Sequence, residues 1–309
     1  MCLSAISPAE SYAKFQKELT DAGLLISLGA PGLYARSGVF EGVIEHFEAL
    51  VTRMARHLAP EVMRFPPVIS RHTYMRTDHI ETFPDLMGSV HSFLGDGRDH
   101  AAMLEKNRCG EDWTTDLRPT AVMLSPAACY PLYPTATGTL PAGGRTVDLR
   151  SYVFRHEPSQ DPARMQVFRQ REFVRLGTPQ QALEHRDYWV TRGTEILNAV
   201  GLDVQCVVAN DPFFGRGGKI MAATQKEQAL KYELVIPVAS AEKPTAITSC
   251  NLHLDHFGRA FDITSADGQV AHTACVGFGL ERIALALFKT HGFEPRAWPA
   301  DVTTALEMS

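Results

Sequence analysis

The strongest constraint on the fold is the pattern of short apolar segments in the second half of the chain. Runs of strand length recur there, and tight connections separate most of them. Short connections favour antiparallel pairing, because parallel strands need a crossover of a dozen or more residues. The expected strands are 147–154, 166–176, 205–209, 231–237, 245–253, 259–263 and 272–276. The sequence therefore predicts an α+β fold built on an antiparallel sheet.

Amphipathic segments predict helices that flank this sheet. Ser7-Pro8-Ala9-Glu10 is typical of a helix start, with a capping serine, a proline in the first helical position and a glutamate three residues after the cap. Two prolines interrupt the apolar stretch 62–69, which is therefore expected to be an edge strand. No linker is evident, so one domain over 1–309 is expected, with the helix at about 7–22 as an extension. Further helices are expected at 39–58, 179–200, 222–230 and 283–290.

Composition narrows the possible partners and location. The 309 residues carry a net charge of −5, whereas a general nucleic-acid binder normally has a basic excess. No signal peptide and no membrane-spanning run is evident, so a cytoplasmic protein is expected. The six cysteines are scattered without a CxxC pair, which favours reduced thiols. His72, His79 and His91 are expected to be surface or core residues.

The hairpin expected around 154–168 carries side chains suited to a nucleotide. Arg155 lies at the end of a strand, Glu157 follows on the same face, and Arg164 lies in the loop before Phe168. Guanidinium groups bind phosphate oxygens in pairs and stay charged, and a flat apolar ring can stack on a base. The alternative is an ordinary surface hairpin with exposed arginines and one core phenylalanine.

A glycine-rich segment near the end of the chain offers a second cation. Gly277-Phe278-Gly279 follows a strand, and Arg282 opens the next helix. A strand, a glycine turn and a helix could indicate a dinucleotide fold. Against that, no third glycine follows at the right place, no parallel βαβ series surrounds the segment, and it lies at the end of the chain.

Together and in this order, the two segments resemble motifs 2 and 3 of class II aminoacyl-tRNA synthetases. The resemblance implies a class II antiparallel sheet flanked by helices, and ATP as a substrate. It implies catalytic roles for Arg155 and Arg282 at the phosphates. The helix and strand around 39–69 also resemble motif 1 of that family, which forms the dimer interface there. The implied ATP-binding residues are Arg155, Glu157, Arg164, Met165, Phe168, Lys231, Ala246, Ile247, Thr248, Ser249 and Arg282.

The same resemblance leaves the ligands of the ATP-bound Mg²⁺ open. The family usually has an acid where this chain has Ala246. Glu233 could substitute for it, or Ser249 together with water could suffice.

Cys129, Glu172 and Cys275 lie far apart in the sequence, and their spacing alone indicates nothing more than two buried cysteines and a glutamate. Cys129 lies in Ser-Pro-Ala-Ala-Cys-Tyr-Pro, Glu172 lies in Arg-Gln-Arg-Glu-Phe, and Cys275 comes just before the glycine-rich segment. In the atypical seryl-tRNA synthetases of methanogens, a zinc ion held by two cysteines and a glutamate binds the substrate amine. The resemblance therefore implies one Zn²⁺ on these three residues, with Glu172 and Asn251 contacting the amino acid.

From about Gly32 onward the chain resembles the amino acid:[carrier protein] ligases, relatives of the catalytic core of those synthetases. The resemblance implies a homodimer without a tRNA-binding domain. It implies ATP-dependent activation of a small amino acid, glycine or alanine, and transfer to the phosphopantetheine thiol of a carrier protein. Two alternatives remain: a truncated synthetase that charges tRNA or another acceptor in trans, and a non-catalytic regulatory paralogue that binds amino acid or nucleotide.

Overall fold

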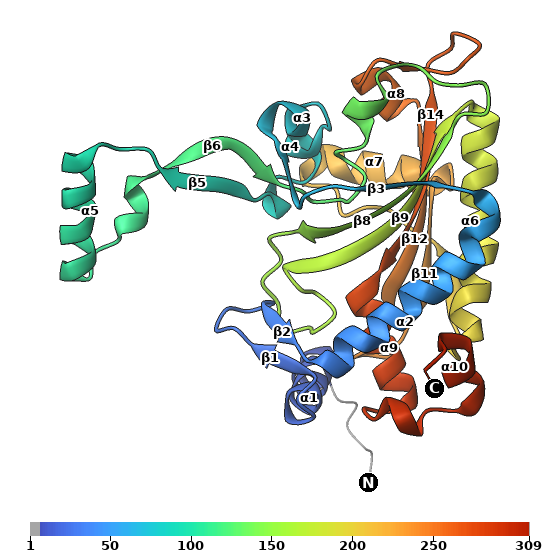
Figure 1. Ribbon diagram of the computed structural model, residues 1–309, viewed down its shortest axis with the longest axis horizontal. Helices are drawn as coiled ribbons and strands as arrows, with labels where there is room; N and C mark the ends of the chain where they lie inside the picture. Colours follow the sequence, from blue (N-terminus) through green and yellow to red (C-terminus); the bar gives the residue numbers. More distant parts are fainter. Residues whose placement is uncertain (1–6, 309) are drawn as a thin grey trace.

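A seven-stranded sheet organises the computed structural model, which describes residues 7–308 (Figure 1). The strand order is β10-β11-β12-β14-β9-β8-β3, and every neighbouring pair is antiparallel except β3 and β8. The α+β prediction is therefore confirmed, with one parallel pair added at the edge. The strands are β3 (Glu61–Arg64), β8 (Arg145–Phe154), β9 (Val167–Gly177), β10 (Gln205–Val208), β11 (Lys231–Ile236), β12 (Thr245–Leu254) and β14 (His272–Gly279).

Helices cover one face of the sheet, called here the back face. α6 (Pro179–Ala199) and α9 (Leu280–His291) pack directly on its central strands, and α2 (Gly38–Ala55) and α10 (Ala300–Leu306) pack on those helices. Trp189 of α6 is fully buried and stacks on Phe173 with ring centroids 4.7 Å apart. Burying a large apolar side chain stabilises a fold by about 1.5–3 kcal/mol, so the back face supplies most of the core. The opposite face is left for a cavity.

The first helix and a small hairpin lie at one end of the sheet. α1 (Pro8–Asp21) has the expected capping box, in which Ser7 and Glu10 bond to each other's backbone N–H groups. The short hairpin β1 (Leu25–Ser27) and β2 (Tyr34–Arg36) follows, and Gln166 donates its backbone N–H to Gly32 O in that hairpin. The β1–β2 hairpin thereby contacts the loop before β9.

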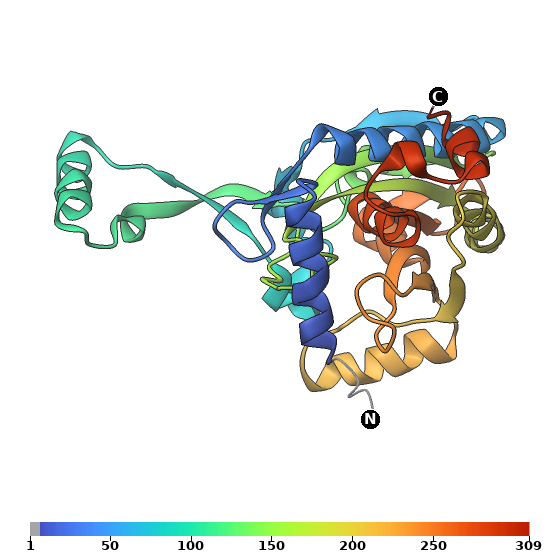
Figure 2. The same cartoon turned by 90° about the horizontal axis from the view of Figure 1, so that it is seen from below.

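An arm projects from the body between β3 and β8 (Figures 1 and 2). β4 (Val68–Ser70), β5 (Ser89–Phe93) and β6 (Leu117–Leu124) form its ribbon, and α5 (Gly97–Cys109) lies at its tip. The expected edge strand 62–69 is thus two strands in two sheets, because Pro66 and Pro67 end the pairing of β3. β6 is the longest strand of the ribbon, and only Met123 in it is buried.

Smaller elements frame the front of the sheet. The strand expected at 259–263 is wrong: its first two residues end α8 (His256–Ala260), a turn follows, and only Ile263 lies in a strand, because a helical turn lets Phe257 and Phe261 both stack on Tyr133. α7 begins earlier than the expected 222–230. The remaining elements are α3 (Arg71–Met75), α4 (His79–Thr82), α7 (Gly215–Glu227), β7 (Gly138–Thr139), β13 (Ile263–Thr264) and the 3₁₀ helices Arg56–Leu58, Pro84–Leu86, Trp113–Asp116, Tyr133–Ala136 and Pro295–Ala297.

Between residues 7 and 308 the helices are all too short or too polar to cross a bilayer. Cysteines in this range are free thiols, as the sequence predicts, and Cys2 lies outside it.

Candidate active site

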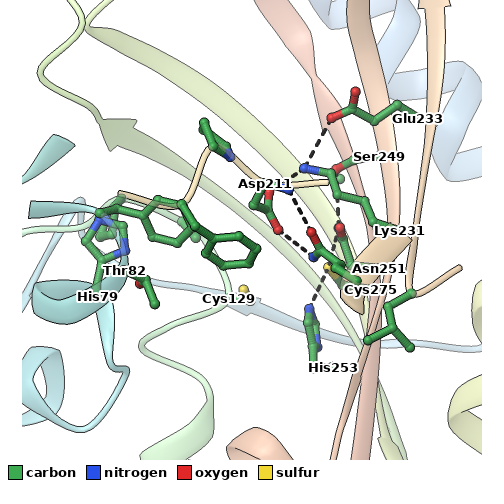
Figure 3. A pocket seen from close by; sticks show the side chains of 18 of the residues that line it. His79, Thr82, Cys129, Asp211, Lys231, Glu233, Ser249, Asn251, His253 and Cys275 are labelled. Carbon is green, nitrogen blue, oxygen red and sulfur yellow. Dashed lines mark hydrogen bonds and ion pairs between the residues drawn. The ribbon is translucent and has the colours of Figure 1, made fainter. Parts of the chain in front are cut away.

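A cavity of about 530 Å³ opens on the front of the sheet (Figure 3). Its floor is formed by β9, β14, β12 and β11, and its walls come from the loop around Pro126–Tyr130, from α4 and from the segment before and within α7. Because side chains alternate across a strand, every second residue of each floor strand points into the cavity. Glu172, Gly277, Ser249 and Glu233 are paired in register and form one row across all four strands.

The two arginines singled out from the sequence meet in this cavity. Arg155 donates its Nε to Pro126 O at 3.1 Å, and its guanidinium carbon lies 5.5 Å from the Phe168 ring centroid. Arg282 donates Nε to Ala163 O at 2.8 Å and Nη1 to Ala246 O at 2.9 Å, and lies 6.0 Å from the same ring. Burial, together with the charges of Arg155 and Arg164, lowers the pKa of Arg282 to about 10.

Backbone carbonyls orient these arginines without neutralising them. Among the described residues, neither Arg155 nor Arg282 forms an ion pair with a carboxylate within 4.0 Å. Two cations therefore flank one aromatic ring without a counter-charge from the protein. Such an arrangement suits an anionic ligand with a flat base.

Three residues predicted to bind the nucleotide do not line the cavity. Arg164 and Glu157 pair with each other at 2.8 Å in the loop between β8 and β9. Met165 is 3% exposed and lies in the core. Arg155, Phe168, Lys231, Ala246, Ile247, Thr248, Ser249 and Arg282 all line the cavity. Eight of the eleven residues predicted to bind the nucleotide therefore line the cavity, and their role in binding stays a prediction.

At the other end of the floor, the buried side chains of Cys129, Cys275 and Glu172 all line the cavity. The neighbouring Cys275, burial and the charge of Glu172 raise the pKa of Cys129. Glu172 Oε1 accepts from Ala128 N at 3.1 Å, whereas its Oε2 is buried without a partner. Burial, and then the charge of Cys275, raise the pKa of Glu172 to about 8. The three side chains therefore form a buried acidic cluster.

Donors around Cys275 favour its thiolate. Asn251 Nδ2 at 3.5 Å and His253 Nε2 at 3.6 Å face its sulfur (Figure 3). Cys129 has the largest effect and, together with His253 and Asn251, lowers the pKa of Cys275 well below that of an ordinary thiol.

Whether this cluster could hold a metal can be judged from its donors. Two sulfurs and a carboxylate oxygen without a partner match the ligand chemistry of Zn²⁺. In their present positions, however, no group of three or more His, Cys, Asp or Glu side chains that could hold a metal ion occurs in the described part of the chain. The donor types fit zinc, and the zinc site stays a prediction.

Known proteins resemble the chain over most of its length. No family model matches the chain. The chain is 44% identical over 285 residues to amino acid–[acyl-carrier-protein] ligase 1 of Bradyrhizobium diazoefficiens. The aligned region covers 92% of this chain and 87% of that protein. The chain belongs to the amino acid–[acyl-carrier-protein] ligase family. The family predicted from the sequence is therefore confirmed, and the protein is a ligase.

Solved structures place this ligase among class II synthetase cores. The Methanopyrus kandleri seryl-tRNA synthetase, solved with Aquifex aeolicus tRNASec, matches with a TM-score of 0.80 at 21% identity. The Pyrococcus horikoshii seryl-tRNA synthetase complexed with ATP matches with a TM-score of 0.70 at 14% identity. Each match covers 95% of the ligase, which spans 60% and 62% of those two chains. The predicted class II fold is confirmed.

The cavity of this ligase also contains a charged residue, Asp211, that the sequence pattern did not indicate. Lys231 is buried and binds both Asp211 and Glu233, the latter at 3.1 Å (Figure 3). Asp211 lies in the loop before α7 and accepts from Gln225, so this ion pair ties the α7 segment to the sheet. No motif marks Asp211, because its role depends on a contact with a strand distant in sequence.

His79 was expected to be a surface or core residue, and the structure places it in the cavity wall. Its Nδ1 lies 3.4 Å from the Tyr130 hydroxyl, and its Nε2 is buried without a partner. Burial, with a contribution from Arg155, lowers its pKa to about 4. His79 is therefore neutral at neutral pH.

Proposed function

We propose that the protein activates a small amino acid with ATP and transfers it to the phosphopantetheine thiol of a carrier protein. The observation that carries the proposal is the meeting of unpaired cations and a buried acidic cluster in one cavity. Arg155 and Arg282 suit the phosphates, and Cys129, Glu172 and Cys275 suit an amine held through a metal. The relatives' names, and the ATP bound to one structural neighbour, support the same reaction.

In the first step the amino-acid carboxylate attacks the α-phosphorus of ATP. A new carboxyl oxygen–phosphorus bond forms, the bond to the bridging oxygen of the β-phosphate breaks, and pyrophosphate leaves. The carboxylate is already a nucleophile, so the protein supplies position and charge and no general base is needed. Phe168 stacks on the adenine, while Arg155 and Arg282 stabilise the charge that develops on the phosphates.

Mg²⁺ accompanies ATP in this proposal. It prefers hard oxygen ligands and usually takes only one or two from a protein. Ala246 supplies no side-chain oxygen, so Glu233 and Ser249, paired in register on β11 and β12, are the residues that would hold it. The ion would neutralise phosphate charge.

Zn²⁺ would be held by Cys129, Glu172 and Cys275 and would bind the free amine of the substrate. The protein's own part is to keep these donors buried and to orient Cys275 through Asn251 and His253. Asn251 also lies beside the amine position, on the cavity floor. We propose glycine or alanine as substrates, as the resemblance to the ligase family implies.

In the second step the carrier thiol attacks the carbonyl carbon of the aminoacyl-adenylate. The carbon–sulfur bond forms, the carbon–oxygen bond to the phosphate breaks, and AMP leaves as the thiol proton is released. A thioester and AMP are the products.

The transfer step is tested with labelled glycine and alanine, ATP and three acceptors. Label should appear on the phosphopantetheine-bearing carrier protein, be released by hydroxylamine, and be absent from the carrier protein without its prosthetic group. Label on tRNA alone would instead identify a synthetase that acts in trans. Absence of label on every acceptor, with amino acid still bound, would identify a regulatory paralogue.

We also propose a homodimer through α2 and β3. Val39 and Val62, on these two elements, are 50% and 62% exposed although apolar. Burying exposed apolar surface is the usual driving force for a stable interface. Light scattering during gel filtration should give twice the mass of the 34.1 kDa chain, and a monomer at micromolar concentration would contradict it.

A further inference from the structure

A buried charge cluster lies on the back face of the sheet, behind the cavity. It contains Glu281, Arg169, Glu41 and Arg36, and is called here the back-face cluster. Glu281 is 2% exposed, and its two oxygens accept from Arg169 N at 2.7 Å and Arg169 Nε at 2.9 Å. Arg169 in turn donates both terminal nitrogens to Glu41, at 2.6 and 2.9 Å. Two carboxylates and two guanidinium groups thereby satisfy one another.

The cluster joins three elements at the point where α9 begins. Glu41 comes from α2, Arg169 from β9, and Glu281 from the first turn of α9. Gly279 precedes this helix and provides no side-chain cap, so no such bond fixes the helix start. The carboxylate of Glu281 instead fastens the first turn of α9 to the backbone of β9.

Each end of this link is adjacent in sequence to a residue of the cavity. Glu281 precedes Arg282, and Arg169 follows Phe168. On the cavity side, the guanidinium carbon of Arg282 lies 6.0 Å from the centroid of the Phe168 ring. A bond between Glu281 and Arg169 on one face therefore sets the distance between Arg282 and Phe168 on the other.

We propose that Glu281 is a positioning residue, which acts through Arg169 and Glu41 to set Arg282 against the base-stacking ring. The inference rests on the proposed nucleotide site. It assigns no contact between Glu281 and the substrate, since the carboxylate lies behind the sheet. Its effect on ATP must therefore pass through Arg282.

A neighbouring cluster provides a matched control. Arg171, also on the back face of β9, donates to Asp148 at 2.8 and 3.2 Å, and both side chains are nearly as buried as Glu281. This second cluster joins β9 to β8 and, through Glu48 O, to α2, whereas none of its hydrogen bonds or ion pairs within residues 7–308 reaches α9. Loss of Asp148 should reduce stability without moving Arg282.

The test is a double-mutant cycle on the binding of Mg²⁺-ATP, measured by calorimetry on the full chain. Glu281→Gln should weaken binding about ten-fold, because small displacements of a positioned group are costly. In an Arg282→Ala background the same change should have less than about a two-fold effect, as expected for groups that act as one unit. Asp148→Asn should stay within about two-fold in both backgrounds.

Three results would overturn the inference: a ten-fold loss from Glu281→Gln that persists without Arg282, an equal loss from Asp148→Asn, or no loss in a folded Glu281→Gln protein. Should that variant not fold, Glu41→Gln takes its place, because Glu41 is 32% exposed and tolerates change better. A smaller loss, about three-fold, is then expected, again only when Arg282 is present. Failure of the unaltered protein to bind Mg²⁺-ATP would reject the proposed function itself.

Discussion

The two ends of the cavity differ in the charge that the protein leaves without a partner. At the nucleotide end, Arg155 and Arg282 are held by backbone carbonyls and lack a carboxylate within ion-pair distance in the described structure. At the amine end, Glu172 has an oxygen without a partner and lies beside two sulfurs. The nucleotide end therefore suits an anion, the phosphates of ATP. The amine end suits a cation, the metal ion that would bind the amino group of the substrate.

The pKa shifts of two buried groups, His79 and Glu172, also differ in direction. At the nucleotide end, burial and Arg155 keep His79 neutral and lower its pKa. At the amine end, burial and Cys275 raise the pKa of Glu172. Both groups are buried, and the nearby charge of each end acts in the same direction as burial. Substitutions at one end should therefore affect ATP, and substitutions at the other end should affect the amino acid.

The largest effect is expected from Arg155→Ala. Removing one preorganised donor from a developing charge typically costs about 10²–10³-fold in rate, so pyrophosphate exchange should fall about 1,000-fold in kcat/KM. Arg259→Ala is the control, because that exposed arginine pairs only with Asp255. A loss below about three-fold for Arg155→Ala would show that the nucleotide end is misassigned.

A smaller effect is expected at the amine end from Cys275→Ser. The change should weaken zinc binding about 100-fold and raise the KM for the amino acid, while the KM for ATP stays nearly constant. Metal content after dialysis and exchange kinetics measure the two effects. Cys206→Ser, at an exposed thiol, should retain both. Unchanged metal content in the Cys275 variant would remove the zinc proposal.

Phe168→Leu should sharpen the assignment of the nucleotide end. Stacking of a base on an aromatic ring is worth about 1–3 kcal/mol, so the KM for ATP should rise about ten-fold. The KM for the amino acid should not change, because the ring faces the two arginines. An exposed aromatic, Phe214, serves as the control. An increase confined to the amino-acid KM would reverse the assignment of the two ends.

The smallest effect concerns His79, whose pKa lies near 4 against an ordinary 6.5. Since the folded-state value is depressed, the neutral ring stabilises the fold above pH 6.5, and this stability is lost as pH falls from 6.5 toward 4. The loss amounts to at most about 3 kcal/mol. NMR titration of His79 should show the low pKa, and Arg155→Ala should raise it. A pKa that does not change in that variant would place Arg155 away from this wall.

The sequence predicted those parts of the fold and of the site that depend on local pattern. Apolar runs of strand length predicted β8 and β9, and the glycine turn before Arg282 predicted the start of α9. Resemblance, rather than spacing, brought Cys129, Glu172 and Cys275 together, because they come from separate elements. All three line the same cavity in the structure.

Contacts between distant segments were not predictable from local pattern. Asp211 meets Lys231 only because the α7 segment folds over the sheet, and Glu281 meets Arg169 only because α9 starts behind β9. The segment 259–263 was misassigned as a strand, since the gain from stacking Phe257 and Phe261 on Tyr133 is tertiary. Local pattern predicted elements, and tertiary packing decided their partners.

The central claim is that both ends act on one reaction, and amino-acid-dependent ATP–pyrophosphate exchange tests it most directly. Metal-loaded protein should exchange label between pyrophosphate and ATP with glycine or alanine, and should show no exchange without an amino acid. Absence of exchange with all twenty amino acids, in protein that retains its metal and its fold, would contradict the account.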